Sequence, residues 1–280
     1  MGDPLSSPWD LAHRTAESAG VSIVPLTRLE DAEGVARVID AVWGEQGMPR
    51  ELIRAFQHAG SVLLGARGNG DLVGFVLGFY GMADGLHLHS HMLAALPEWR
   101  DRGVGYALKL GQRAECLTNG VEEVRWTFDP LVARNARFNL VKLGAVAIRF
   151  LPGFYGEMGD RLNRGDRSDR FEIRWSLRSD RVERALSRSA EAPSAGPVLL
   201  EAVGDRDAPE PKETGARPGP GATVAIPPDQ LALRSADPEL GRRWRDACAA
   251  AAARCFEHGL VATWFTADRM YLFEPRAPAT

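Results

Sequence analysis

The chain has 280 residues, of which 45% are hydrophobic and 25% are charged, and its formal net charge at pH 7 is −3. This composition is that of a globular protein with one large domain or two small ones. It argues against a protein-wide positive field for nucleic acid, and no apolar run approaches the roughly 18 residues that a membrane span needs.

The first half of the chain is predicted to alternate strands and helices. Residues 1–20 lack the basic and apolar segments of a signal peptide, so we expect a polar tail with a helical turn or two. From residue 21 the hydrophobic periodicity predicts the order β-α-α-β-β-β-α-β-α-β-β. The strands are expected at 21–27, 61–68, 71–81, 86–96, 121–129, 145–156 and 170–177, and the helices at 33–44, 49–60, 103–117 and 134–144.

Three local signals support this order. Asp31 is predicted to cap the first helix, because an Asp side chain accepts from unpaired amides at a helix start. Gly68-Asn69-Gly70 lies between two apolar runs and predicts a hairpin turn. Gly144 is expected to end the last helix as a C-cap.

The pattern of the chain changes after Ser179. Residues 205–221 are rich in Pro and Gly and nearly free of apolar side chains, which predicts a loop or linker. A long helix is expected at 237–259, where Leu240, Trp244, Ala251 and Cys255 share one stripe. The other predicted elements here are a helix at 180–188 and strands at 197–204, 222–227, 261–268 and 269–275.

The segment RDRGVG, residues 100–105, lies between a predicted strand and a predicted helix. A helix start leaves backbone amides unpaired, glycines let that backbone approach an anion closely, and the arginines add positive charge. The turn therefore predicts a phosphate or pyrophosphate site, although an ordinary turn with surface arginines is an equal alternative. A P-loop and a dinucleotide-binding fingerprint are excluded, because the required Lys and third Gly are absent.

At this turn the sequence resembles the GNAT superfamily of acyl-CoA N-acyltransferases. Arg100, Gly103 and Gly105 match the signature (Gln/Arg)-x-x-Gly-x-(Gly/Ala), and Asn135 with Lys142-Leu143-Gly144 gives a looser second match. The resemblance covers about residues 21–178. It implies an α/β fold of the GNAT type, with a mixed, largely antiparallel central sheet flanked by helices. The expected organisation is an N-terminal tail at 1–20, a GNAT-like domain at 21–178 and a C-terminal α/β extension at 179–280.

The resemblance also implies the activity: direct transfer of an acyl group, most simply acetyl, from acyl-CoA to a small-molecule amine. Backbone groups of Leu93 and Ala95 would pair with the pantetheine arm, and Asn135 would bind the pantetheine or the acceptor. The family's usual acid, a Tyr, is replaced by Leu140, which leaves Tyr155 or Tyr106 as candidates. Coenzyme A pyrophosphate would lie on the turn and the helix start, held by Arg100, Arg102, Gly103, Val104, Gly105, Tyr106 and Ala107.

Three histidines, His87, His89 and His91, alternate on the strand before the turn. Alternate residues share one face of a strand, so we expect them to lie beside Leu93 and Ala95. The family's base is often a Glu at this place, and His89 or His91 is a candidate replacement, since a His near its free pKa accepts a proton at neutral pH. Structural histidines are the more frequent alternative, and a metal site is a weaker one.

Other residues add alternatives that the sequence leaves open. Asp129 is expected either to hold a cationic acceptor or to cap the following helix. The cysteines, Cys116, Cys248 and Cys255, form no CxxC pair and predict buried thiols in a reduced, cytoplasmic protein. A coenzyme A-binding module without catalysis, an enzyme for larger acyl groups and a thioester hydrolase remain alternatives. No metal, nucleic acid or membrane is expected as a partner, and a homodimer is possible.

Overall fold

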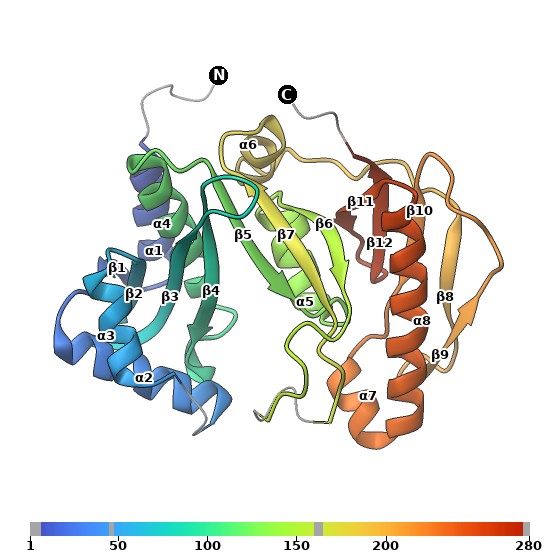
Figure 1. Ribbon diagram of the computed structural model, residues 1–280, viewed down its shortest axis with the longest axis horizontal. Coiled ribbons are helices and arrows are strands. Elements are labelled where there is room, and N and C mark those ends of the chain that lie inside the picture. Colours follow the sequence, from blue (N-terminus) through green and yellow to red (C-terminus); the bar gives the residue numbers. More distant parts are fainter. Residues whose placement is uncertain (1–6, 45–47, 160–164, 277–280) are drawn as a thin grey trace. The chain divides into compact units, whose positions relative to one another are not determined.

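The computed structural model describes residues 7–44, 48–159 and 165–276 (Figure 1). Contacts between Cα atoms divide the chain into two compact units, Met1–Trp126 and Thr127–Thr280. This boundary lies inside the predicted domain 21–178, and the separate extension at 179–280 stays a prediction. None of the described helices is both long enough and apolar enough to cross a membrane.

The first unit contains five strands in the order β1-β2-β3-β4-β5. Neighbouring strands are antiparallel, except that β4 and β5 are parallel. This confirms the mixed, largely antiparallel sheet and the predicted order of elements. The strands are β1 Ser22–Pro25, β2 Val62–Gly68, β3 Asp71–Gly81, β4 His87–Ala95 and β5 Glu123–Phe128, whose last two residues belong to the second unit.

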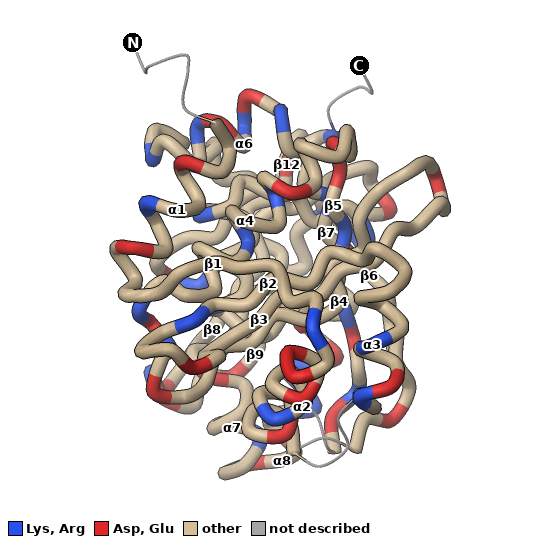
Figure 2. Tube along the Cα trace, turned by 90° about the vertical axis from the view of Figure 1, so that its left-hand side faces the viewer, with Lys and Arg blue, Asp and Glu red and all other residues tan. Residues whose placement is uncertain are grey.

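Helices cover both faces of this sheet. The helices are α1 Pro8–Ser18, α2 Leu29–Trp43, α3 Arg50–His58 and α4 Val104–Thr118. Helix α4 packs against β2, β3, β4 and α1, whereas α2 packs on β3, β4 and α3 (Figure 1). Figure 2 shows that β2, β3 and β4 are mostly uncharged, as expected for strands buried between two helical layers.

Two predictions at the start of the chain need correction. The expected tail contains an 11-residue helix, α1, because Ser7 and Asp10 form a capping box at its start; residues 1–6 lie outside the described part. Helix α2 begins at Leu29, so Asp31 is not its N-cap. Asp31 lies inside the first turn, where its Oδ2 accepts from the amides of Thr27 and Arg28 at 3.1 and 3.0 Å.

The predicted hairpin turn is confirmed. Asn69 and Gly70 have φ angles of 53° and 90°, the left-handed values that a two-residue hairpin turn requires. The turn fixes the register of β2 against β3, so that Gly65 faces Phe75. Because β3 in turn pairs with β4, this register also positions the strand that carries the histidines.

Among its described residues, the second unit contains seven strands in the order β7-β6-β11-β12-β10-β8-β9. Helix α8 packs on several of these strands and buries Trp244 and Cys255. The strands are β6 Val146–Leu151, β7 Arg170–Ser176, β8 Val198–Gly204, β9 Pro209–Glu213, β10 Ala222–Ala225, β11 Leu260–Phe265 and β12 Met270–Pro275. The helices are α5 Ala133–Ala136, a π-helix at Arg137–Lys142, α6 Asp180–Leu186, α7 Gln230–Ala236 and α8 Pro238–Glu257.

Two predictions in this unit were wrong in part. The expected linker 205–221 contains β9, an end strand that pairs antiparallel with β8. Its prolines, Pro209 and Pro211, are two residues apart, so their missing N–H groups lie on one side, which an end strand tolerates. The helix expected at 134–144 is a short α-helix followed by a π-helix, although Gly144 does follow it with a φ of 68°.

Candidate functional site

The predicted anion site is a tight turn between β4 and α4. A short 3-10 helix, Pro97–Trp99, precedes it, and Asp101 and Gly103 have φ angles of 60° and 93°. Gly103 is the N-cap of α4, and its left-handed conformation favours glycine. The structure thus confirms that α4 starts directly after the RDRGVG segment.

Four successive amides at this turn are available to a ligand. Within the described ranges, the amides of residues 102–105 donate to no recorded acceptor. The amides of Tyr106 and Ala107 instead donate to the carbonyl oxygen of Gly103, at 3.0 Å each. From the sequence, the anion was expected on the backbone of residues 102–107. In the structure, only the amides of residues 102–105 remain without an acceptor for it. Together with the positive end of the α4 dipole they suit a phosphate group.

The side chain of Trp99 packs between the turn and Gly68 at the end of β2. A Cβ at Gly68 would lie 2.4 Å from the Trp99 ring, so this glycine makes room for the indole at the end of β2. The guanidinium carbon of Arg102 lies 5.1 Å from the centre of the Trp99 ring, a cation–π contact. Arg102 is therefore held beside the unpaired amides, with Arg100 exposed on the same turn.

Gly105 shows that space remains above the helix start. A Cβ built there would meet only a methyl carbon of Leu93, at 3.8 Å, which is ordinary contact. No contact with the described residues therefore requires residue 105 to be glycine. A glycine that the protein itself does not need is consistent with a ligand that approaches the backbone closely, as a pyrophosphate does. The residues at the turn therefore fit the phosphates of coenzyme A.

The strand before the turn contains a bulge at His91. Met92 faces Leu77 on β3 and Ser90 faces Gly78, which leaves His91 as the extra residue between them. A bulge shifts the alternation by one residue. Leu93 consequently points toward Gly105 on the α4 side of the sheet, opposite to His89. The expectation that Leu93 and Ala95 share the histidine face was wrong, because the bulge depends on pairing with β3.

The parallel pairing of β4 with β5 is short. It joins Leu88 to Val124 and His89 to Arg125. Strand β4 then continues to Ala95 beyond the last recorded pair. Its backbone groups in this stretch, including those of Leu93 and Ala95, form the edge that the resemblance assigns to the pantetheine arm.

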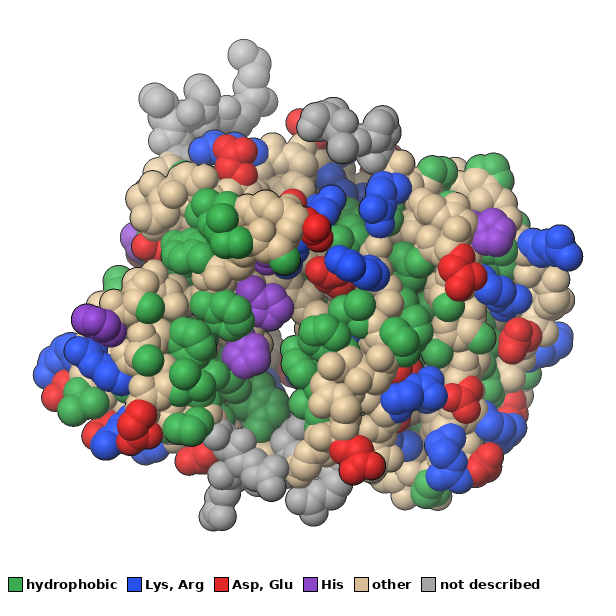
Figure 3. Space-filling model, in the orientation of Figure 1, with side chains coloured by type: hydrophobic (Ala, Val, Ile, Leu, Met, Phe, Trp, Pro, Cys, Tyr) green, Lys and Arg blue, Asp and Glu red, His purple; other side chains and the backbone are tan. Residues whose placement is uncertain are grey.

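His89 and His91 both lie against the ring of Phe79. Their ring centroids are 5.1 and 5.9 Å from that of Phe79 and 6.2 Å from each other. Figure 3 shows histidine side chains among hydrophobic side chains on one face of the molecule. Desolvation, followed by the nearby His91, His87 and Lys109, lowers the pKa of His89 to about 4. Desolvation also lowers the pKa of His91, although its side chain reaches the surface.

These pKa shifts change the argument for a histidine base. The sequence argument assumed a histidine near its free pKa, and the structure lowers the pKa of both candidates. His87 is buried and its Nδ1 lies 2.9 Å from the carbonyl oxygen of Gly85, a structural contact. In the described part of the chain, no three His, Cys, Asp or Glu side chains are arranged to hold a metal ion.

Sequence reasoning missed Lys109. Its side chain is 2% exposed on α4, and its Nζ donates to Ser90 Oγ at 2.8 Å and to Gln112 Oε1 at 3.0 Å. The Nζ also lies 3.8 Å from the centroid of the Trp126 ring. Burial lowers the pKa of Lys109 to about 7. A lysine at a position where the helical period requires a buried residue was the only available signal.

Other candidates lie in the second unit. Asn135 is half-buried near the start of the helical segment, and Leu140, at the place of the family's Tyr, is fully buried. The hydroxyl of Tyr155 lies 3.2 Å from Thr127 Oγ1. The predicted roles of Asn135, Tyr155 and Tyr106 stay predictions.

Asp129 has a partner that the sequence did not suggest. Both of its carboxylate oxygens accept from the guanidinium of Arg245, at 2.7 and 2.8 Å, and Oδ1 also accepts from the amide of Leu131 at 2.9 Å. Arg245 is almost fully buried and also pairs with Asp166. Asp129 is therefore an internal counter-ion of Arg245, and its side chain accepts from the amide of Leu131 instead of capping the helix at Val132. Its predicted role toward a cationic acceptor stays a prediction.

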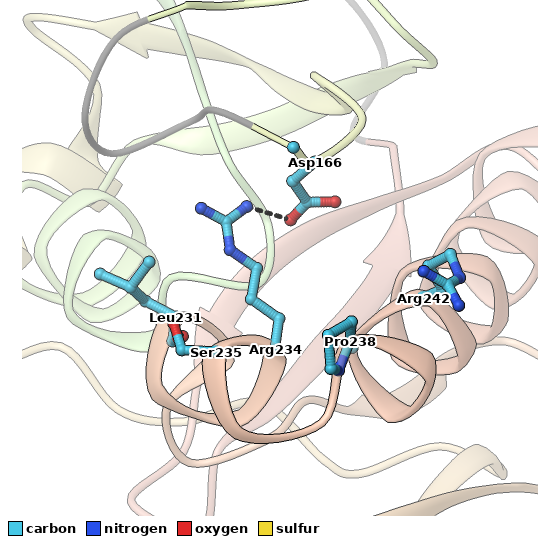
Figure 4. Close-up of a pocket in the computed structure, with 8 residues that line it drawn as sticks. Asp166, Leu231, Arg234, Ser235, Pro238 and Arg242 are labelled. Carbon is cyan, nitrogen blue, oxygen red and sulfur yellow. Dashed lines mark hydrogen bonds and ion pairs between the residues drawn. The ribbon is translucent and has the colours of Figure 1, made fainter.

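A cavity of about 390 Å³ lies next to this ion cluster in the second unit (Figure 4). Figure 4 shows the guanidinium of Arg234 directed at Asp166, and the two are 2.9 Å apart. The remaining lining residues include Leu231, Ser235 and Pro238. Arg234 and Asp166 pair with each other, and the third charged lining residue, Arg242, pairs with Glu239 outside the cavity, so each charged group already has a protein partner.

The three cysteines are buried and free, which confirms their predicted packing role. Burial raises the pKa of each thiol to about 12. A thiol with such a pKa is protonated at neutral pH and is a poor nucleophile. Cysteine-based catalysis therefore receives no support from the site.

Part of the chain is similar to known proteins. Residues 27–138 match the acetyltransferase (GNAT) family model. No curated protein matches the chain significantly. Similar solved structures include the ribosomal-protein-S18-alanine N-acetyltransferase from Escherichia coli, with 14% identity over 56% of this chain and 94% of that one and a TM-score of 0.47. An acetyltransferase of the GNAT family from Streptococcus pneumoniae (14%, 55% and 97%, 0.46) and an aminoglycoside 6′-acetyltransferase type Ii (15%, 56% and 97%, 0.44) are further examples.

Proposed function

We propose that this chain, whose residues 27–138 match the acetyltransferase (GNAT) family model, transfers an acyl group, most simply acetyl, from acyl-CoA to a small-molecule amine. N-acyl transfer from acyl-CoA is the activity of the family. The observation that carries the proposal for this chain is the group of four unpaired amides at the start of α4, beside Arg102. They form an anion site at the place where the family binds the pyrophosphate.

In the proposed complex, the pyrophosphate accepts from the amides of residues 102–105 and is neutralised by Arg100 and Arg102. The pantetheine arm extends along the edge of β4 and pairs with backbone groups of Leu93 and Ala95. Support for this placement comes from the end of the β4–β5 pairing at His89 and from the open space at Gly105. Together these contacts would hold the thioester near His91.

The proposed reaction is a direct attack of a neutral amine on the thioester carbonyl. His91 is the preferred base, because its lowered pKa keeps the ring neutral at pH 7 and its side chain reaches the surface. His89, with a pKa of about 4, is the weaker proton acceptor of the two and serves to position His91 through the shared contact with Phe79.

The acceptor is the finer part of the proposal. Among the similar structures, one is an enzyme named for a ribosomal protein and another for an aminoglycoside, so the fold accommodates acceptors of very different size. A coenzyme A-binding module without catalysis is the second candidate. The buried Leu140 at the place of the family's acid favours it.

Thermal shift with coenzyme A, acetyl-CoA and longer acyl-CoAs, followed by free-thiol release with a panel of amines and a peptide with a free N-terminus, tests the proposal. We expect stabilisation by acetyl-CoA and thiol release with a small amine. Release only with the peptide would replace the small-molecule acceptor, and release without any amine would indicate a thioester hydrolase. Stabilisation by coenzyme A without thiol release for any acceptor would favour the binding module.

A further inference from the structure

Lys109 is a buried charged group on α4, whose buried residues also include Gln112 and Arg113. It projects from α4 toward the sheet, between the fully buried residues Leu108 and Leu110 of its own helix. Its Nζ donates hydrogen bonds to Ser90 and Gln112 and makes a cation–π contact with Trp126. An ammonium in such surroundings costs free energy, so a purely structural reason for lysine at this position is weak.

The ammonium lies where β4 and β5 separate. The last recorded pair between these strands is His89 with Arg125. Ser90 and Trp126, the two residues that Lys109 contacts on the sheet, are the next residue on each strand. Lys109 therefore lies at the closed end of the opening between the strands, which is where the proposed function places the thioester.

Ser90 connects Lys109 to that opening. Its side chain is 6% exposed, and its Oγ accepts the hydrogen bond from Lys109. Its own hydroxyl hydrogen has no recorded acceptor among the described residues, so it is available for a further hydrogen bond. His91, the extra residue of the bulge, directly follows Ser90 and lies with His89 against Phe79, on the face opposite to Lys109.

We propose that Ser90 and Lys109 form a proton relay that protonates the coenzyme A thiolate as it leaves, in place of the family's tyrosine. The inference rests on the proposed function. The nitrogen of the acceptor forms the bond to the carbonyl carbon, and the carbon–sulfur bond breaks. Ser90 gives its hydroxyl proton to the sulfur and takes one from the Lys109 ammonium. The base removes the proton of the attacking amine, and Lys109 regains its proton from water before the next turnover.

The surroundings suit an acid that works near neutral pH. Burial lowers the pKa of Lys109 to about 7, so at that pH a large fraction carries the proton that the relay needs. The charged and titratable groups near Lys109 include Cys116 and the buried Arg113 on α4, and His89 on β4, whose pKa Lys109 helps to lower. Cys116, with its pKa of about 12, stays a neutral thiol, and His89, with its pKa of about 4, stays neutral too.

The relay has a direct readout that needs no acceptor. A bound coenzyme A thiol next to the Lys109 ammonium should have a lower pKa than the free thiol, measured by the ultraviolet absorbance of the thiolate as a function of pH. The variants K109M and S90A should remove this difference. Lys212→Met, on an exposed strand of the second unit, is the matched control and should retain it. An unchanged thiol pKa in K109M would overturn the relay.

Kinetics with the best amine supply the second readout. Wild-type kcat should fall as the pH rises through about 7, because Lys109 loses its proton. In K109M, kcat should fall by about 100-fold, with that limb absent and the KM for acetyl-CoA nearly unchanged. S90A should behave in the same way. If K109M folds like the wild type and its kcat still falls as the pH rises through about 7, the proposal is contradicted.

The chain has only three lysines, Lys109, Lys142 and Lys212, so carbon-13 labelling of lysine gives three signals. Coenzyme A should shift the Lys109 signal and its titration, and leave the Lys212 signal in place. If coenzyme A does not bind at all, the proposed function fails together with the relay. If it binds and is turned over while the Lys109 signal and the pH profile stay unaffected, only the relay fails.

Discussion

Arg102 lies over the indole ring of Trp99, with 5.1 Å between its guanidinium carbon and the ring centroid, beside four amides that have no recorded acceptor. This contact joins the arginine of the turn to the end of β2, because Trp99 packs against Gly68. The positive charge is thereby positioned before any ligand arrives, which reduces the entropy lost on binding.

Replacement of Arg102 with Ala should therefore weaken coenzyme A binding by about 10-fold, roughly the 1–2 kcal/mol expected for one charge-assisted contact. The loss should shrink at high salt, because the interaction is electrostatic. Isothermal titration at two salt concentrations measures both effects. Arg28→Ala, which removes another exposed arginine of the same unit, should bind as the wild type does. Equal affinities for Arg102→Ala and the wild type would exclude the turn as the pyrophosphate site.

The two glycines of the turn should respond differently to substitution. Gly103 has a φ of 93°, so Gly103→Ala should destabilise the fold by about 1 kcal/mol. At Gly105 a Cβ meets only ordinary contacts, so Gly105→Glu should fold with nearly wild-type stability and lose coenzyme A binding by charge repulsion and bulk. Urea unfolding and titration with coenzyme A separate the two effects. Gly105→Ala is the milder comparison, expected to retain stability and to weaken coenzyme A binding less than Gly105→Glu does.

The acidic side of the pH profile should report on His91. A general base must be neutral, so thiol release should rise with pH through a pKa below 6.5, the ordinary value for histidine. His91→Gln should abolish this limb and reduce kcat by about 100-fold. His89→Gln should keep the limb, because His89 with its pKa of about 4 is not the base. If the rise of thiol release with pH disappears in His89→Gln and persists in His91→Gln, His89 is the base and His91 is not.

Lys109 should also make stability depend on pH. Its pKa is about 7 in the folded chain and 10.5 for a free lysine, so between these values the unfolded chain binds more protons. Stability of the wild type should therefore rise with pH across this window, and the cost of burying the charge should be complete below pH 7. Lys109→Met should be more stable than the wild type by roughly 3–5 kcal/mol at pH 6, a difference that narrows toward pH 10. Urea unfolding at several pH values checks this.

The pair of Asp129 and Arg245 should contribute to stability and not to acceptor binding. Asp129→Ala would leave the almost fully buried Arg245 with one carboxylate fewer, and should destabilise the fold by about 3 kcal/mol. Glu201→Ala, which removes an exposed partner of Lys212, should change stability by less than about 0.5 kcal/mol. Denaturant unfolding measures both variants. A wild-type stability for Asp129→Ala, with a raised KM for a cationic acceptor, would restore the predicted acceptor role.

The sequence by itself determined the features that depend on neighbouring residues. The hairpin at Asn69-Gly70 and the helix start after RDRGVG follow from glycine's access to positive φ and from local hydrophobic periodicity. The family signature lies in the same local segment, so the fold class and the tight turn at the start of α4 were predictable. Errors of one or two residues, such as the start of α2 before Asp31, arise because caps depend on side-chain geometry.

Only the tertiary structure decided which side chains meet. The bulge at His91 exists because β4 pairs with β3 in a particular register, and it moves Leu93 to the face opposite His89. Lys109 meets Ser90 and Trp126 because α4 packs under the two strands where they separate. The lowered pKa values of Lys109 and His89 come from burial in this assembled unit. Contacts between residues distant in sequence, and the desolvation that they cause, have no local pattern, so the chemistry of the site became visible only in the folded chain.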